Sequence, residues 1–199
     1  MKFPRKTLLL FLCVLMGNAI GCARSTLKPS ERPTSRPFMD GEGTEIGIGR
    51  FEPRVEAFIT PPAGWNIDKE EINDERTHLV WLSPSRETAY GVVYAKAPFY
   101  LPAMKMFHEK ALDRVIEAFR DDQGEAELLS QQWDDDRKAM RFEAKGGLYH
   151  IRSILTVRGK SVWTVYAGTR NGREPVPDEL AIAESAREAT LVGREADGE

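Results

Sequence analysis

The sequence contains very little cysteine: two of its 199 residues are cysteines, Cys13 and Cys22, and both lie near the N-terminus. The chain after residue 22 therefore has no thiol to form a disulfide, ligate a metal or act as a nucleophile. Histidine is also scarce. No two of His78, His108 and His150 have the i, i+4 spacing of a helical metal-binding pair. Histidines from separate elements could still converge in space to bind a metal, which the sequence does not show.

No part of the sequence is strongly basic. Lysine and arginine number 28 against 31 aspartates and glutamates, which gives a formal net charge of −3 at pH 7. Because nucleic-acid binding requires concentrated positive charge against the phosphates, this composition argues against a nucleic-acid partner. It also provides no basic stretch that would hold the chain on an anionic lipid surface by charge.

Recognisable catalytic motifs are missing as well. The sequence has no Gly-x-Ser-x-Gly elbow, and no Ser/His/Asp set or carboxylate pair stands at a catalytic spacing. The glycines before residue 50 lack the Lys-Ser/Thr pair that closes a phosphate loop. Asp134, Asp135 and Asp136 lack the glycine and alternating spacing of a calcium loop, and we interpret them as a solvated hairpin tip. We therefore expect no enzymatic activity, no cofactor and no bound metal.

The N-terminus has the pattern of a secretory signal. Lys2, Arg5 and Lys6 form a positively charged start, and an apolar stretch at residues 8–16 follows it. This stretch is about half of the roughly 20 residues that a membrane-spanning helix needs. Residues 1–21 are therefore predicted to be a signal peptide that is removed.

Residues 19–22, Ala-Ile-Gly-Cys, resemble the lipobox of bacterial lipoproteins, in which small residues precede an obligatory cysteine. Gly21 and Cys22 match that pattern, whereas Ala19 stands where the family usually has leucine. The resemblance implies cleavage between Gly21 and Cys22 and lipidation of Cys22, with enough acyl chains for stable membrane anchoring. Because Ala23 follows in place of aspartate, it also implies a lipid-anchored location in the cell envelope, at the periplasmic face of the outer membrane.

The rest of the chain is predicted to consist of a tether, one domain and a tail. Residues 22–50 contain three prolines and no sustained apolar periodicity, which is typical of a flexible linker with a reach on the order of 30 Å. Residues 51–192 are long enough to bury a core of their own. Residues 193–199 are expected to form a disordered tail.

The patterning of the domain predicts a mixed α+β fold around an antiparallel sheet. Strands are predicted at residues 55–59, 77–82, 89–95, 126–133, 139–145, 149–157 and 161–168, and helices at residues 104–119 and 177–189. Short links join the last four strands, which indicates an antiparallel meander. Apolar Ile151 and Leu155 alternate with polar Arg152, Thr156 and Arg158, so one face of the sheet should be buried and the other wetter.

The order of strands, turns and helices in the domain resembles that of the PsbP-like (Mog/PsbP) superfamily. The features that carry the resemblance are the start at residues 58–65, Phe-Ile-Thr-Pro-Pro-Ala-Gly-Trp, then Ser83-Pro84 after the second strand, a long helix, and a closing strand at residues 161–167. The resemblance covers about residues 52–192. It implies an α/β/α sandwich with a central antiparallel sheet, in a family that mostly binds or scaffolds rather than catalyses. A fold does not by itself transfer a function.

An apolar segment between strand and helix, at residues 97–102, is the candidate binding site. Pro98, Phe99, Tyr100 and Leu101 are expected to line a groove for a partner, because exposed apolar surface tends to mark binding sites. The leading hypothesis is a membrane-anchored, non-enzymatic binding or assembly module with an envelope protein as partner. The alternative is a small-ligand carrier or weak hydrolase, with a pocket near the long helix and His108.

Overall fold

The computed structural model describes residues 36–39, 45–73, 76–171 and 176–192. The predicted signal peptide, Gly21, Cys22 and the predicted tail lie outside these residues. In chain order the elements are β1 (Arg36–Met39), β2 (Glu45–Glu52), β3 (Ala57–Ile59), β4 (Asn66–Ile72), β5 (Arg76–Leu82), β6 (Thr88–Leu101), α1 (Lys105–Gln123), β7 (Ala126–Asp134), β8 (Ala139–Gly146), β9 (Tyr149–Arg170), α2 (Pro177–Ala189) and β10 (Leu191–Val192). The mixed α+β fold predicted from the sequence is confirmed.

The main sheet is antiparallel throughout and has the order β4-β5-β6-β9-β8-β7. Strand β9 reverses on itself, because its first arm pairs with β8 and its second arm pairs with β6. The backbone N–H of Asn171 donates to the carbonyl of Leu148 at 2.8 Å, so the two ends of the strand lie side by side. Gly159, with φ at +63°, stands at the reversal, where only glycine adopts that backbone cheaply. The predicted meander is therefore confirmed.

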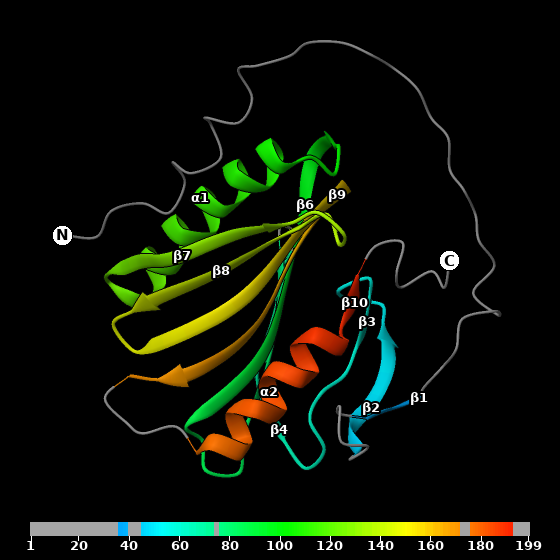
Figure 1. The fold of residues 1–199 in the computed structure, drawn as a ribbon, viewed down its shortest axis with the longest axis vertical. Coiled ribbons are helices and arrows are strands. Elements are labelled where there is room, and N and C mark those ends of the chain that lie inside the picture. The colour runs from blue at the N-terminus through cyan, green and yellow to red at the C-terminus, as the bar shows by residue number, and fades with distance from the viewer. Residues whose placement is uncertain (1–35, 40–44, 74–75, 172–175, 193–199) are drawn as a thin grey trace. The chain divides into compact units, whose positions relative to one another are not determined.

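The two helices cover opposite faces of this sheet, as Figure 1 shows. On one face, α1 packs Leu112 and Ile116 against Met140, Phe142 and other apolar side chains of β8 and β9. On the other face, α2 lies over β6 and β9 beside a second cluster, whose buried members include Leu79, Trp81, Tyr90, Val92, Tyr94, Trp163, Val165 and Ala186. The face of β9 predicted to be wetter is thus covered by α2, and Thr156 on it is 6% exposed.

A smaller sheet, in the order β1-β2-β3-β10, begins within the segment predicted to be a tether. The folded part therefore starts before residue 51, with Arg36 already paired to Gly49. The sequence does not predict β2 as a strand, because its buried positions include Gly47 and Gly49 rather than large apolar residues that would show alternation. A Cβ on Gly47 would lie 2.4 Å from the carbonyl oxygen of Pro61, so only glycine allows this close approach.

Two further stretches expected to be loops are strands. The mixed charges at residues 68–76 are typical of a loop, but residues 68–72 belong to β4, the edge strand that pairs with β5, and Arg76 begins β5. Most of β4 is exposed on both faces, so it carries no apolar alternation, and charged residues on an open edge also discourage pairing with other chains. Residues 97–101, expected to be an apolar loop, extend β6, and Leu101 pairs with Gly159 across the β9 reversal.

Among the described residues, no helix combines the length and the apolar character needed to cross a membrane.

Candidate binding site

The predicted groove residues lie at the end of β6, where it leads into α1. Phe99 is 45% exposed and Tyr100 is 70% exposed, while Leu101 is half-buried. Met104 and Met106, at the start of α1, are also exposed. Met104, the first residue of the helix predicted at residues 104–119, is the N-cap residue of α1, and its side chain is 54% exposed.

We call these four exposed side chains, Phe99, Tyr100, Met104 and Met106, the aromatic–methionine patch. They fall within eight consecutive residues that span the β6–α1 junction. Tyr100 also lies next to Gly159 at the β9 reversal. A Cβ added to Gly159 would be 3.9 Å from Cε2 of the Tyr100 ring. Large aromatic and methionine side chains are enriched in the cores of protein interfaces, so this junction suits recognition of another protein.

His108 is a packed core residue. It is fully buried, its Nδ1 lies 2.9 Å from the carbonyl of Met104, and its Nε2 accepts the backbone N–H of Val157 at 2.9 Å. Its ring packs edge-on against Trp133. Burial lowers its pKa, which matches a neutral ring with Nδ1 protonated. With both nitrogens engaged, the ring has no free atom for a ligand or a proton-transfer role.

His78 and Tyr166 form a second internal pair, between β5 and β9. The Nε2 of His78 and the hydroxyl of Tyr166 are 2.8 Å apart. Burial, with the charges of Lys69 and Arg76, lowers the pKa of His78 to about 4, and burial raises the pKa of Tyr166. Neither group titrates near neutral pH in the folded protein, so the pair is a structural contact.

We expect the protein to lose stability as the pH falls from about 6.5 to about 4. In the unfolded chain His78 takes up a proton near pH 6.5, whereas in the folded chain it does so near pH 4, so acid favours the unfolded state across that window. The free energy of unfolding should fall by about 2 kcal/mol, less than the full shift because the ring is partly exposed. Urea unfolding between pH 7.5 and 4 measures this. In the His78→Gln variant the decline should be shallower, and equal slopes for the two proteins would contradict the assignment.

His150 and the three consecutive aspartates serve local structure. His150 Nε2 lies 2.7 Å from Glu143 on the neighbouring strand. Asp134 accepts the backbone N–H of Arg137, and Asp135 accepts Trp133 Nε1, so these carboxylates stabilise the β7–β8 turn as the hairpin-tip interpretation expects. In the described part of the chain, no group of three or more histidine, cysteine, aspartate or glutamate residues is arranged to hold a metal ion.

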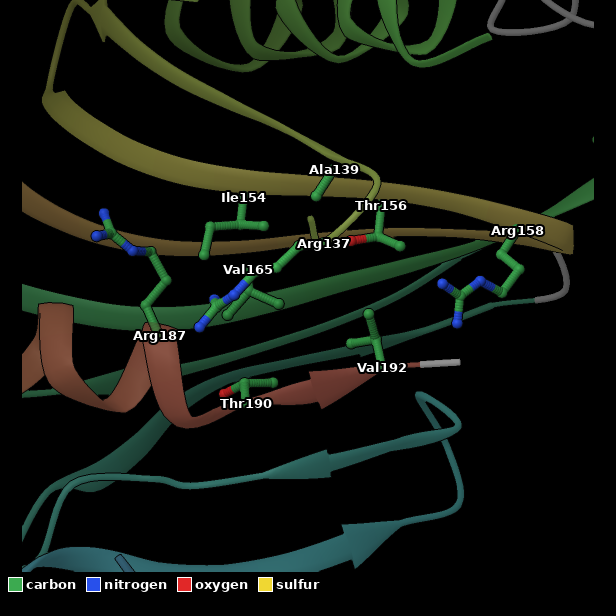
Figure 2. A pocket seen from close by; sticks show the side chains of 9 residues that line it. All are labelled: Arg137, Ala139, Ile154, Thr156, Arg158, Val165, Arg187, Thr190 and Val192. Carbon is green, nitrogen blue, oxygen red and sulfur yellow. The ribbon is translucent and has the colours of Figure 1, made fainter. Parts of the chain in front are cut away.

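A pocket that the sequence did not predict lies between α2 and the sheet. Figure 2 shows Arg158, from the end of the first arm of β9, and Arg187, from α2, at opposite ends of it, with Arg137 of the β7–β8 turn between them. The remaining lining residues are apolar or carry hydroxyl groups: Ala139, Ile154, Thr156, Val165, Thr190 and Val192. Three guanidinium groups therefore face one pocket whose lining includes no carboxylate.

Glu188 joins the arginines around this pocket. It accepts Arg137 at 2.8 Å, Arg187 at 2.8 Å, and both terminal nitrogens of Arg141 at 2.6 and 2.9 Å. Burial opposes ionisation of Glu188, but hydrogen bonds and charges from Arg141 and Arg187 overcome it and lower its pKa to about 2. One carboxylate thus remains ionised and is shared by three guanidinium groups.

A wider groove adjoins the pocket along the same face. Its volume is about 420 Å³, and Arg187 lines both the groove and the pocket. Polar and charged side chains from β7, β8 and β9 dominate the rest of the lining: Ser130, Gln131, Gln132, Arg141, Phe142, Glu143, Arg152 and Ser153. Neither this groove nor the pocket is lined by a residue of α1, so neither corresponds to the ligand site expected near His108.

The sequence held only a partial signal for this region. Arg152 and Arg158 lie on the polar side of the alternating pattern of β9, which was interpreted as a wetter face. The other participants, Arg137, Arg141 and Arg187, come from a turn, another strand and a helix. Their convergence depends on α2 folding back over the sheet, which single-sequence spacing does not report.

Comparison with known proteins assigns no family to the chain. No protein-family model matches it, and a search of curated proteins finds no match. Among solved structures, a crystal structure from Bacteroides thetaiotaomicron, at 1.50 Å resolution, is similar with a TM-score of 0.40 and 14% sequence identity. The match covers 77% of this chain and 50% of that chain, so this chain spans about half the length of that protein. The function of the site accordingly rests on its own geometry.

Proposed function

We propose that this chain is a lipoprotein, anchored to the cell envelope through lipidated Cys22, whose domain is a non-enzymatic binding or assembly module. The lipobox-like residues that end in Gly21 and Cys22 support the anchor. The order of strands and helices, with helices over both faces of an antiparallel sheet, is consistent with a PsbP-like α/β/α sandwich. The periplasmic face of the outer membrane is the proposed location.

The observation that carries the binding role is the aromatic–methionine patch. Phe99, Tyr100, Met104 and Met106 are each at least 45% exposed, although they cluster within a short stretch of chain. Removing such side chains from water on binding stabilises a complex by roughly 25 cal/mol per Å² of apolar surface. Aromatic residues at the centre of an interface are also the ones whose truncation costs most affinity. A protein partner in the envelope is therefore the proposed ligand of this surface.

Crosslinking in envelope membranes followed by co-purification tests the proposal. Wild-type protein should recover a partner, and the Phe99→Ser/Tyr100→Ser variant should recover at least tenfold less of it, since the loss of hot-spot side chains costs about 2 kcal/mol or more. Ile72→Ser is the matched control, because Ile72 is 54% exposed on β4, away from the patch. It should leave recovery unchanged, and both variants should unfold at nearly the wild-type urea concentration.

The anchor is tested in the same preparation with a Cys22→Ser variant. This variant should appear in the soluble fraction, still able to bind the partner when the two are mixed. A Cys22→Ser protein that stays fully with the membranes would overturn the anchor. No partner above background, or equal losses in the patch variant and the Ile72 control, would overturn the binding role.

A further inference from the structure

Arg158 is a half-buried cation without a counter-ion among the described residues. It forms no hydrogen bond or ion pair with them, and its Nη1 atom is buried with no hydrogen-bond partner. The Nε atom of Arg187, at the other end of the pocket, is also buried and unpartnered. An unpaired donor removed from water costs about 1–3 kcal/mol, and more when it is charged, so folds rarely retain one without a function.

The local charge balance is positive around these two atoms. The guanidinium groups of Arg137, Arg141, Arg158 and Arg187 are accompanied by two carboxylates, Glu188 and Asp134, which accept hydrogen bonds from this set. Two positive charges therefore remain uncompensated. This local excess stands out in a chain whose formal net charge is −3.

The shape of the region sets the kind of ligand. The enclosed part of the pocket is small, about 20 Å³, which is enough for one water-sized group. A ligand therefore inserts one oxygen-bearing end between the guanidinium groups of the pocket, and its remainder leaves past Arg187 into the adjoining groove of about 420 Å³, which is lined mainly by polar side chains. Arginine is well suited to bind such an end, because its planar guanidinium pairs with carboxylate and phosphate oxygens.

We propose that the pocket between α2 and the sheet binds the oxyanion, carboxylate or phosphate, of a small polar ligand. Arg158 is its principal contact, with Arg137 and Arg187 beside it. The pocket lies between α2 and the sheet, on the opposite face of the sheet from α1. None of its lining residues belongs to the aromatic–methionine patch, so the proposal does not depend on the proposed protein partner.

Thermal unfolding in the presence of defined anions tests the site. Inorganic phosphate and succinate, titrated separately at constant ionic strength against chloride, are the probes, and they distinguish a phosphate from a carboxylate ligand. At least one should raise the Tm progressively with concentration, as expected for a ligand that binds the folded state. If neither raises it more than chloride does, the proposal is overturned.

Two variants locate the binding. Arg158→Gln should reduce the affinity for the anion at least tenfold, and without anion it should be as stable as wild type or more so, because Arg158 makes no hydrogen bond or ion pair with the described residues that would be lost. Arg114→Gln is the control, because Arg114 forms an exposed ion pair with Glu117 on α1. This variant should leave anion binding unchanged. Equal stabilisation of wild type and Arg158→Gln by the anion would overturn the assignment. So would a lower stability of the anion-free variant.

The acidic residues Glu195, Asp197 and Glu199 follow Val192, which lines the pocket. A variant ending at residue 192 therefore completes the test. It should bind the anion with the same affinity as the full chain. Binding by the shortened chain alone would mean that the chain's own carboxylates fill the site, and the proposal of a separate ligand would be wrong.

Discussion

Replacing Gly91 by valine is expected to lower the free energy of unfolding by about 3 kcal/mol, the upper end of the usual cost of overpacking a core. Gly91 on β6 lies opposite Tyr166 on β9, and the tyrosine ring crosses β6 at this glycine to reach His78 on β5. A Cβ at residue 91 would lie 2.2 Å from Cζ of Tyr166. No rotamer of valine avoids this contact, because the clash is with Cβ itself.

Urea unfolding followed by circular dichroism measures this effect, and a double-mutant cycle identifies its cause. Tyr166→Ala by itself should also be destabilising, because it leaves a cavity and removes the partner of His78. If the ring is what excludes a side chain, Gly91→Val should add little further cost in the Tyr166→Ala background. Full additivity of the two losses would contradict the steric explanation.

Replacing His108 by leucine is expected to destabilise the protein by about 3 kcal/mol, although leucine is more apolar and similar in size. The substitution leaves the buried backbone N–H of Val157 without its acceptor, and the Met104 carbonyl without its ring donor at the start of α1. A buried donor left unpaired costs about 1–3 kcal/mol, and the imperfect fit beside Trp133 adds to this.

His150→Leu is the matched control for this substitution. His150 lies on the sheet in contact with Glu143, and its side chain is 32% exposed. Loss of such a partly exposed pair should cost no more than about 1 kcal/mol. Equal losses in the two variants, measured by urea unfolding at pH 7.5, would show that the buried hydrogen bonds of His108 are not what matters.

Local sequence determined those parts of the fold whose signal is periodic or depends on turn chemistry. The apolar spacing through Leu112 and Ile116 predicted the packed face of α1, and both residues are buried there. The predicted bounds of the second helix match α2. The meander followed from short links such as Gly159, because a glycine between two alternating runs forces a tight reversal. These features depend on neighbours within a few residues.

The strands that the sequence did not predict lack a periodic apolar pattern. In β2 the buried described positions are Gly47, Gly49 and Glu52, and in β4 most side chains are exposed and most are charged or polar, so neither strand shows apolar alternation. Local sequence does not predict the end of β6 as a strand, because Pro98 and exposed aromatic residues interrupt its alternation. In each case the pairing with a distant strand, rather than local preference, decides the conformation.

The candidate sites divide in the same way. The sequence by itself located Phe99 and Tyr100 as a candidate binding segment, because both lie in one short apolar run. Of the arginine pocket it indicated only Arg158, on the polar side of the β9 alternation, because Arg137 and Arg187 come from a turn and a helix that are distant in the sequence. The tertiary structure brings the three arginines together because α2 folds over the polar face of β9, which buries the Nη1 atom of Arg158 where water would otherwise have solvated it.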